Sequence, residues 1–279
     1  MTQTQAQTQT GQTDDAALKA KHAAMWAMGD YPAVATEVIA SLGPVLVEHA
    51  GISAGERVVD IAAGSGNAAI PAARLGADVV ATDLTPELVE TGRQAAEAQG
   101  VSLRWRVADA EAMPCDDGEH DVAISCVGIM FAPHHQAAAD ELVRIVRPGG
   151  RIALLSWTPA GFIGRMFATM KPYAPPPPPG AQPPPLWGDE AHVRALLGDR
   201  VTDLVAERRT VGVGLFADGA SFRDFFKRTY GPTIAVYRAL ADDPARTEEL
   251  DDALAALGDH ALRDGAMEWE YLLLYAGRA

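Results

Sequence analysis

One stretch of the chain, residues 58–83, constrains the fold more than any other. An apolar strand containing Asp60 leads into the glycine loop Gly64-Ser65-Gly66 and a helix, and a second apolar strand ends in Asp83. Glycines at these positions can take backbone conformations closed to other residues, so a ligand can approach the main chain at the N-terminus of the helix. Asp83 is then placed to accept hydrogen bonds from both hydroxyls of a ribose. The pattern predicts a nucleoside-binding βαβ unit.

The glycine loop alone leaves the class of nucleotide open. Residues 64–69 also fit the G-x-G-x-x-A pattern of dinucleotide-binding proteins, so a nicotinamide-dependent oxidoreductase is one alternative. Asp60, at the end of the first strand, would suit the ammonium of an amino-acid-bearing ligand better than a pyrophosphate. A third strand, residues 102–107, leads into Asp109, which could accept a hydrogen bond from an adenine amino group. Acids at the ends of three strands favour a cationic nucleoside.

The segments that follow alternate strand and helix patterns. We expect strands at residues 120–126 and 151–157 and helices at residues 86–100 and 134–146. Thr85 is the expected N-cap of the first of these helices. Strands and helices that alternate at these lengths predict a parallel sheet.

With its motifs in this order, the segment 55–157 resembles the class I S-adenosylmethionine-dependent methyltransferases, particularly the branch that includes ubiquinone and menaquinone biosynthesis enzymes. The strand-like residues 267–274 fit that family's terminal antiparallel strand. The resemblance implies an α/β fold with a Rossmann-like seven-stranded sheet, mostly parallel with the last strand antiparallel. Helices would sandwich the sheet, and a helical lid or cap would cover it.

The same resemblance implies which residues bind S-adenosylmethionine. Asp60, Gly64 and Gly66 would form the first cofactor motif, and Cys126 would begin the segment that borders the methyl-donor end. The positions implied for the ribose and the adenine are Asp83, Leu84, Asp109 and Ala110. One departure is visible, because Ala62-Ala63 stands where the family often has Gly-Cys or Gly-Thr. We expect cofactor binding to survive this slightly bulkier loop.

Composition and charge narrow the class of protein. A formal net charge of −14 makes nucleic acid a poor substrate, since phosphates normally require a basic surface. No apolar run is long enough to cross a bilayer and no secretory pattern begins the chain, so we expect a cytoplasmic enzyme. The two cysteines, Cys115 and Cys126, are too few for a disulfide framework or a closed zinc site, and we expect no metal.

Breakers and periodicity predict the domain organisation. Helices are expected at residues 14–28 and 33–50. The proline run at residues 175–179 predicts a stiff, extended segment. The predicted units are a disordered tail (1–13), an N-terminal helical cover (14–50), the cofactor-binding core (51–157), a Pro-rich lid and helix (158–200), a core strand (201–216), a helical cap insertion (217–265) and a terminal core strand (266–279).

The run Pro175–Pro179 has two interpretations. It could be a ligand for a proline-recognition domain, in which case the protein would be a non-catalytic interaction module. Apolar side chains flank the run on both sides, so we favour a lid that folds back over the active site. Together with the aromatic cap, this lid predicts an apolar acceptor pocket for a small, largely hydrophobic metabolite.

The residues expected around this pocket are apolar or aromatic. They are Trp26, Tyr31, Phe162, Met166, Tyr173, Trp187, Phe226 and Tyr230. Taken one at a time, such side chains more often pack a protein's own core. A protein or RNA methyltransferase is the alternative, and it would need an open groove. The acceptor atom (oxygen, nitrogen or carbon) and the choice between monomer and homodimer stay open.

Methyl transfer by in-line displacement needs mainly alignment and exclusion of water. A general base helps if the acceptor carries a proton. The candidate is His134, because it begins the helix after the fourth strand, and His135 is a weaker alternative. Tyr31 could orient a hydroxyl. The alternative for His134 is a solvated or capping residue, which is common for a histidine at a helix start. We expect His22 to be structural and Glu111 to be a solvated loop acid.

Overall fold

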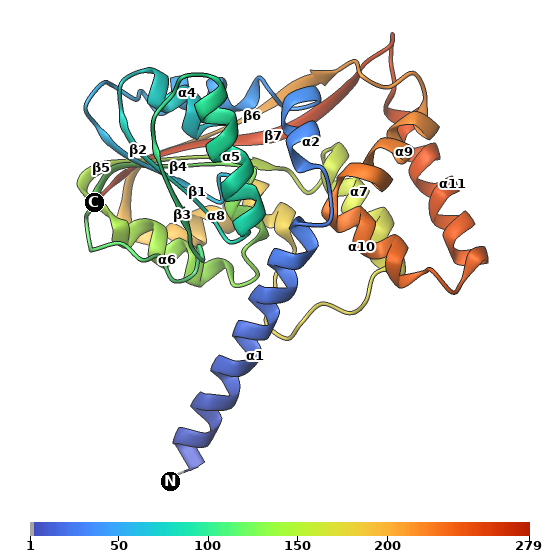
Figure 1. Ribbon diagram of the computed structural model, residues 1–279, viewed down its shortest axis with the longest axis horizontal. Coiled ribbons are helices and arrows are strands. Elements are labelled where there is room, and N and C mark those ends of the chain that lie inside the picture. The colour runs from blue at the N-terminus through green and yellow to red at the C-terminus, as the bar shows by residue number, and fades with distance from the viewer. Residues whose placement is uncertain (1–2) are drawn as a thin grey trace.

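The computed structural model describes residues 3–279, with side chains from Asp15 onward, and its centre is one seven-stranded sheet (Figure 1). The strand order is β3-β2-β1-β4-β5-β7-β6. Neighbours from β3 to β5 pair in parallel, and β7 lies antiparallel between β5 and β6. The predicted fold class is confirmed. The strands are β1 (Arg57–Ile61), β2 (Asp78–Asp83), β3 (Arg104–Val107), β4 (His120–Cys126), β5 (Val146–Trp157), β6 (Val201–Val213) and β7 (Met267–Arg278).

Helices cover both faces of the sheet. On one face lie α3 (Leu42–His49), α4 (Ala69–Arg74) and α5 (Pro86–Ala98), and on the other lie α6 (His135–Ile145) and α8 (Glu190–Leu197), as Figure 1 shows. Thr85 occupies the N-cap position of α5, but its side chain makes no capping hydrogen bond. Its amide instead donates to the Asp83 carboxylate, which ties the start of α5 to the end of β2.

The N-terminal segment differs from the prediction in two places. Residues 33–50 form two helices, α2 (Tyr31–Glu37) and α3, because Pro44 lacks an N–H and is tolerated only in a first helical turn. The tail predicted to be disordered is helical from Gln3, since α1 runs from Gln3 to Trp26. Glutamine and alanine favour helix, and extending an existing helix needs no new nucleus. Residues 1–2 of that predicted tail lie outside the described residues.

A helical cap stands at one end of the sheet, at the right of Figure 1. It consists of α7 (Phe162–Met170), α9 (Gly219–Thr229), α10 (Gly231–Ala239) and α11 (Pro244–Ala261), and α7 packs against both α11 and β7. Asp243 caps α11 by accepting from the Arg246 amide. The proline segment joins the cap to the sheet through an exposed loop at residues 175–180. Short 3-10 turns are η1 (Ile129–Phe131), η2 (Lys171–Tyr173), η3 (Pro184–Gly188) and η4 (Gly198–Arg200).

The end of α1 is clamped to the cap through two glycines. A Cβ at Gly29 would collide with the Thr229 carbonyl, and one at Gly231 would collide with the Met25 carbonyl. Such close backbone contacts require glycine. The N-terminal helix and the cap therefore form one packed unit at this point.

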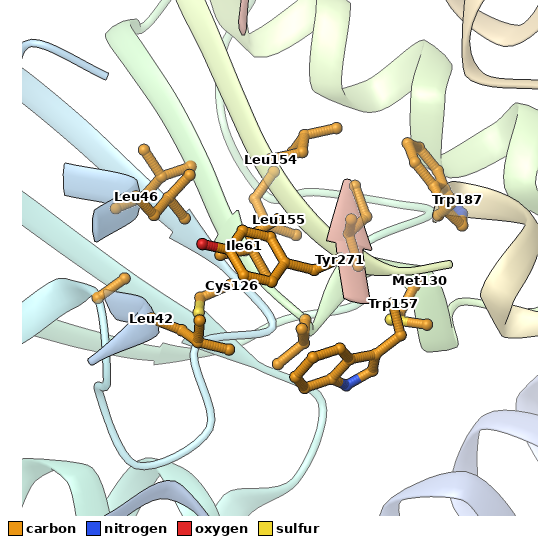
Figure 2. Close-up of a cluster of buried hydrophobic side chains, with 14 of the residues drawn as sticks. Leu42, Leu46, Ile61, Cys126, Met130, Leu154, Leu155, Trp157, Trp187 and Tyr271 are labelled. Carbon is orange, nitrogen blue, oxygen red and sulfur yellow. The ribbon is translucent and has the colours of Figure 1, made fainter. Parts of the chain in front are cut away.

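The sheet's core is apolar and continues into the cap. Figure 2 shows Ile61, Leu154 and Leu155 beside Tyr271, with Leu42 and Leu46 of α3 packed on the sheet. Continuous apolar runs on the central strands are expected where helices cover both faces. Among residues 3–279, no helix has the length and apolar character of a membrane span.

Candidate functional site

A pocket lies where the parallel strands β1 to β4 end. Its volume is about 680 Å³ when the part open to solvent is included, within the range of roughly 300–1,000 Å³ common for ligand sites. Ligands of open α/β sheets bind at this edge. We call it the cofactor pocket, and its lining includes Lys19, His22, Trp26, Tyr31, Ala62, Gly64, Asp83, Leu84, Leu88, Ala108, Asp109, Ala110, Val127, Gly128, Ile129, Phe131, Ala132 and Pro133.

Asp83 faces this pocket from the end of β2. Its carboxylate accepts hydrogen bonds from the amides of Gly64 and Thr85, both at 2.9 Å. Burial raises the pKa of Asp83, and these backbone donors partly oppose the rise. Each carboxylate oxygen has further acceptor capacity, so the group can still receive two ribose hydroxyls.

Asp60 lies behind the glycine loop and is 1% exposed. Neither carboxylate oxygen has a hydrogen-bond partner, and burial raises the pKa of Asp60 to about 8. An unpaired buried carboxyl is costly. Asp60 does not itself line the cofactor pocket, but a ligand ammonium that reached this carboxyl would satisfy it.

Backbone strain gathers around the glycine loop. Gly64 and Gly66 have φ values of +56° and +92°, which glycine tolerates, and a Cβ on Gly64 would press on the Tyr31 ring. Ala62 has a φ of +53°, the conformation that a glycine in the family's usual sequence would adopt without penalty. Val127 has a φ of +49°, which is exceptional for a β-branched residue. Strain of this kind tends to cluster at functional sites.

A cationic side chain of α1 closes the end of the cofactor pocket where the sequence predicts that adenine binds. The Lys19 ammonium lies 2.8 and 3.1 Å from the two carboxylate oxygens of Asp109 and 2.5 Å from Glu111. Burial alone would lower the pKa of Lys19, but the hydrogen bonds to these acids outweigh it and raise the pKa. The expectation that Glu111 is a solvated loop acid is therefore wrong, since its side chain is 6% exposed and ion-paired.

His134 lies at this same end of the pocket rather than at the methyl-donor end. Its amide and its Nδ1 both contact Glu111, at 2.7 and 2.8 Å. His134 does not line the cofactor pocket. This placement does not suit the predicted base. His135 is buried against His192, which together with burial lowers the pKa of His135 to about 4.

Two residues of α1 reach the pocket that the sequence did not assign to it. Lys19 and His22 lie about one helical turn apart, so they share a face. Burial lowers the pKa of His22, which keeps its imidazole neutral at physiological pH. The prediction of a structural role for His22 is corrected, since the ring faces the pocket. Lys19 and His22 lie on the same face of α1 as Trp26, so their spacing from Trp26 in the sequence could have identified both as pocket residues.

A second, apolar pocket lies beside the cofactor pocket. Its volume is about 320 Å³ including space open to solvent, and no charged side chain lines it. Three residues, Tyr31, Val127 and Phe131, line both pockets, so the two cavities share a wall. We call it the aromatic pocket, and its lining is Tyr31, Val34, Ile39, Val127, Phe131, Trp157, Ile163, Phe226, Tyr230 and Trp269.

The structure brings together half of the predicted substrate-pocket residues. Tyr31, Phe226 and Tyr230 line the aromatic pocket, and Trp26 lines the cofactor pocket, where it meets Tyr31, Phe131 and Tyr230 edge-to-face. Burial raises the pKa of Tyr31 and of Tyr230, so both hydroxyls are protonated at neutral pH.

Four other predicted pocket residues line neither pocket, and this is a correction. Phe162 and Met166 share the face of α7 that packs into the cap, where Phe162 stacks on Trp269. The adjacent face carries Ile163 to the pocket instead. Trp187 is buried against His135, and Tyr173 lies under the Arg246 guanidinium. Apolar periodicity located α7 but did not distinguish its two buried faces.

Trp157 and Trp269 were missed, although the sequence held a signal for them. Trp157 ends β5, and Trp269 lies near the start of β7. Because β7 runs antiparallel to β5, the start of one strand meets the end of the other at the ligand-binding edge. Of the predicted cofactor positions, Asp60, Gly66 and Cys126 are not part of the lining.

Two groups of potential metal ligands occur among the residues with described side chains. In the first, made of Asp15, Glu111 and His134, the ammonium of Lys19 pairs with both acids and already supplies a positive charge. The second, Cys115, Glu119 and His120, lies in the loop before β4. Neither group belongs to the lining of the aromatic pocket.

Comparison with known proteins places this geometry in context. A family model described as a methyltransferase domain matches residues 59–154, which run from β1 into β5. An uncharacterized protein of Mycobacterium tuberculosis is 52% identical over 263 residues, covering 94% of this chain and 96% of that protein. The similarity therefore extends beyond the sheet to the N-terminal helix and the cap.

Two further similarities bear on the core. A demethylmenaquinone methyltransferase of Thermus thermophilus is 35% identical over 106 residues, which cover 37% of this chain and 48% of that protein. The solved structure of a geranyl diphosphate methyltransferase in complex with S-adenosylmethionine aligns with a TM-score of 0.52 and 19% identity, covering 86% of this chain and 85% of that one. At this identity the structural match concerns the fold.

Proposed function

The chain belongs to the class I S-adenosylmethionine-dependent methyltransferases, in the branch similar to the ubiquinone and menaquinone biosynthesis enzymes, and from this premise we propose that its acceptor is a small, largely hydrophobic metabolite. The observation that carries the proposal is the wall shared by the two pockets. Tyr31, Val127 and Phe131 border both cavities, so an acceptor in the aromatic pocket would lie next to the cofactor.

Specific residues would hold the cofactor. Asp83 would bind the ribose hydroxyls, Asp60 the ammonium, and Asp109 with Leu84 and Ala110 the adenine. The orphaned Asp60 and the pocket-facing Asp83 support this fit. Charge complementarity between these acids and a cationic ligand is the physical basis.

When bound, S-adenosylmethionine supplies a methyl group that its positively charged sulfur already activates for displacement. The protein's task is then to align the acceptor with that methyl group and to exclude water. Val127, held in a strained conformation between β4 and the pocket, and the Tyr31 ring against Gly64 would fix the geometry at the junction. Rigid positioning of this kind can account for much of a rate enhancement.

The aromatic pocket offers hydroxyls rather than a base. Tyr31 and Tyr230 are its two phenols, and their raised pKa values make them hydrogen-bond donors at neutral pH. Donors would orient an acceptor through an oxygen or nitrogen lone pair. They would also stabilise negative charge on an acceptor that ionises readily, so Tyr31 acts by orientation and not by proton abstraction.

Closure over the cofactor would come from α1. Lys19 and His22 reach the adenine end while the far end of the helix is clamped to the cap by Gly29 and Gly231. Gly180 of the proline loop packs near the His134 ring, and the Gln182 amide donates to the Pro133 carbonyl at the rim. These contacts support a lid formed jointly by α1 and the proline segment.

The test is an activity screen. Purified protein would be incubated with S-adenosylmethionine and a panel of phenolic, quinone-like and isoprenoid compounds, with mass spectrometry detecting the gain of one CH₂. Methylation of a member of the panel, lost in Asp83→Asn, is the expected outcome. A protein or RNA that accepts the methyl group while the whole panel stays unmodified would favour the macromolecular alternative. Binding of NAD in place of S-adenosylhomocysteine would favour an oxidoreductase.

A further inference from the structure

A group of metal-binding side chains lies far from the cofactor pocket. Ligand atoms of Cys115, Glu119 and His120 all lie within 4.8 Å of one another. His120 begins β4, and the opposite end of that seven-residue strand reaches the cofactor edge. A strand of this length spans about 20 Å. The group therefore lies at the opposite edge of the sheet.

His120 is the feature that points to a ligand. Its side chain is 2% exposed, and neither ring nitrogen has a hydrogen-bond partner. A neutral imidazole ring carries one nitrogen lone pair that can coordinate a metal ion. Buried polar groups are normally satisfied, and a metal ion would satisfy this one.

The loop that carries the other two ligands is held in place by the protein. Gly118, with a φ of +66°, makes the turn between Cys115 and Glu119. The Asp116 amide donates to a Glu119 carboxylate oxygen at 2.9 Å. The Arg144 guanidinium donates to the Cys115 carbonyl at 2.7 Å and to Met113, so the turn is braced from α6. A site built on such supports needs little rearrangement to bind.

We propose that Cys115, Glu119 and His120 bind one Zn²⁺ ion. Thiolate, imidazole and carboxylate are the ligands that zinc uses in proteins, and water would complete the usual four-coordinate geometry. Small rotations of the side chains would bring the three atoms to bonding distance. Binding displaces the thiol proton of Cys115, so affinity rises with pH.

The surrounding charges permit a cation. Two guanidiniums lie near Cys115, but Arg144 is paired with Glu141 and Asp117, and Arg106 donates to the Pro114 carbonyl. The positive charge of Arg144 is therefore compensated, whereas the carbonyl that Arg106 contacts carries no net charge. Glu119 and the ionised Cys115 would neutralise the ion itself.

The expected role is structural. Zinc would fasten the loop between β3 and β4 to the start of β4, leaving the cofactor edge unchanged. Folding of the loop and binding of the ion are coupled, because the unfolded chain does not hold the three ligands together. The inference does not depend on the proposed substrate.

Cobalt is the probe, since Co²⁺ replaces Zn²⁺ and gives a thiolate-to-metal charge-transfer band. Chelator-treated full-length protein would be titrated with Co²⁺ and then with Zn²⁺. We expect the band to appear at one equivalent of Co²⁺ and to disappear as Zn²⁺ displaces it. The chain has two cysteines, so Cys115→Ser should abolish the band and the matched variant Cys126→Ser should keep it.

Two further variants separate binding from folding. Glu119→Gln and His120→Gln should each weaken Zn²⁺ affinity by more than the roughly tenfold typical of losing an outer-shell partner. Both variants should bind S-adenosylhomocysteine as the wild type does, which shows that they are folded. Absence of the band in the wild type, or its persistence in Cys115→Ser, would overturn the proposal. Unchanged Zn²⁺ affinity in folded His120→Gln would overturn it as well.

Discussion

The ammonium of Lys19 in α1 lies 2.8 Å from the carboxylate of Asp109, the acid that follows β3. The contact joins residues 90 positions apart and brings the N-terminal helix onto the end of the cofactor pocket where we propose that adenine binds. Lys19 is 8% exposed, so solvent screens the ion pair only partly. The packing of α1 on the pocket and the binding of a ligand beside Asp109 should therefore affect each other.

Replacing Lys19 should weaken cofactor binding. Lys19→Met keeps the apolar stem but leaves Asp109 and Glu111 without their cation, so α1 should lose part of its hold on the pocket. We expect a loss of about 1–2 kcal/mol, or roughly five- to thirtyfold in affinity for S-adenosylhomocysteine, by titration calorimetry. The exposed neighbour Lys21 supplies the control, and Lys21→Met should bind normally. Equal affinities in the two variants would contradict the link.

Asp83 should be essential for holding the ribose. Asp83→Asn retains the shape but loses a charge-assisted acceptor, and we expect a cost of about 1–3 kcal/mol in binding free energy. Asp78, at the other end of β2, pairs with Arg104 at the surface, so Asp78→Asn is the matched control. Titration calorimetry measures the affinity of both variants for S-adenosylhomocysteine. If Asp83→Asn binds as tightly as the wild type, Asp83 does not bind the ribose.

Cofactor binding should release a proton at neutral pH. The pKa of Asp60 rises on folding from 3.8 to about 8, so between these values the folded protein holds a proton that the unfolded chain has lost. The stability that this provides is present at low pH and disappears as the pH rises through 8. A bound ammonium favours the ionised carboxylate, so affinity should increase toward pH 8.

Calorimetry in buffers of different ionisation enthalpy measures that proton directly. Wild-type protein should release it near pH 7, and Asp60→Asn should release none while showing a flatter dependence of affinity on pH. Identical proton release in the two proteins would assign the effect to another group.

Filling the aromatic pocket should block the acceptor and spare the cofactor. Ile163 lines that pocket from α7, so Ile163→Trp should lower kcat/KM at least tenfold while the affinity for S-adenosylhomocysteine stays near the wild-type value. Arg165 is exposed on the same helix, and Arg165→Trp should be active. Full activity in Ile163→Trp would place the acceptor elsewhere.

Relieving strain at Ala62 should stabilise the protein. A non-glycine residue at a φ of +53° costs roughly 1–2 kcal/mol, and glycine avoids that cost at the expense of greater chain entropy in the unfolded state. Ala62→Gly should therefore change the free energy of unfolding by about 0 to +1 kcal/mol in urea melts. Ala63, which has no positive φ, is the control, and Ala63→Gly should destabilise. Clear destabilisation by Ala62→Gly would contradict the strained conformation.

Local patterns in the sequence predicted the sheet and the acids of the cofactor site, because strand periodicity and glycine loops are short-range signals. These short-range signals were enough to predict that Asp83 and Asp109 line the pocket. Lys19 and Ile163 were not foreseen, since their roles depend on how helices distant in sequence pack on the sheet. His134 was placed at the wrong end of the pocket because its contact with Glu111 joins two loops that no local pattern relates.

The position of β7 bears on how the protein is made. This strand comes last in chain order, yet it lies between β5 and β6. Among the described strands β6 pairs only with β7, so during synthesis β6 can join the sheet only when β7 does. The nucleotide-binding half can assemble earlier from β1 to β5. Trp269 lies on β7, so the aromatic pocket is completed only when this strand joins the sheet.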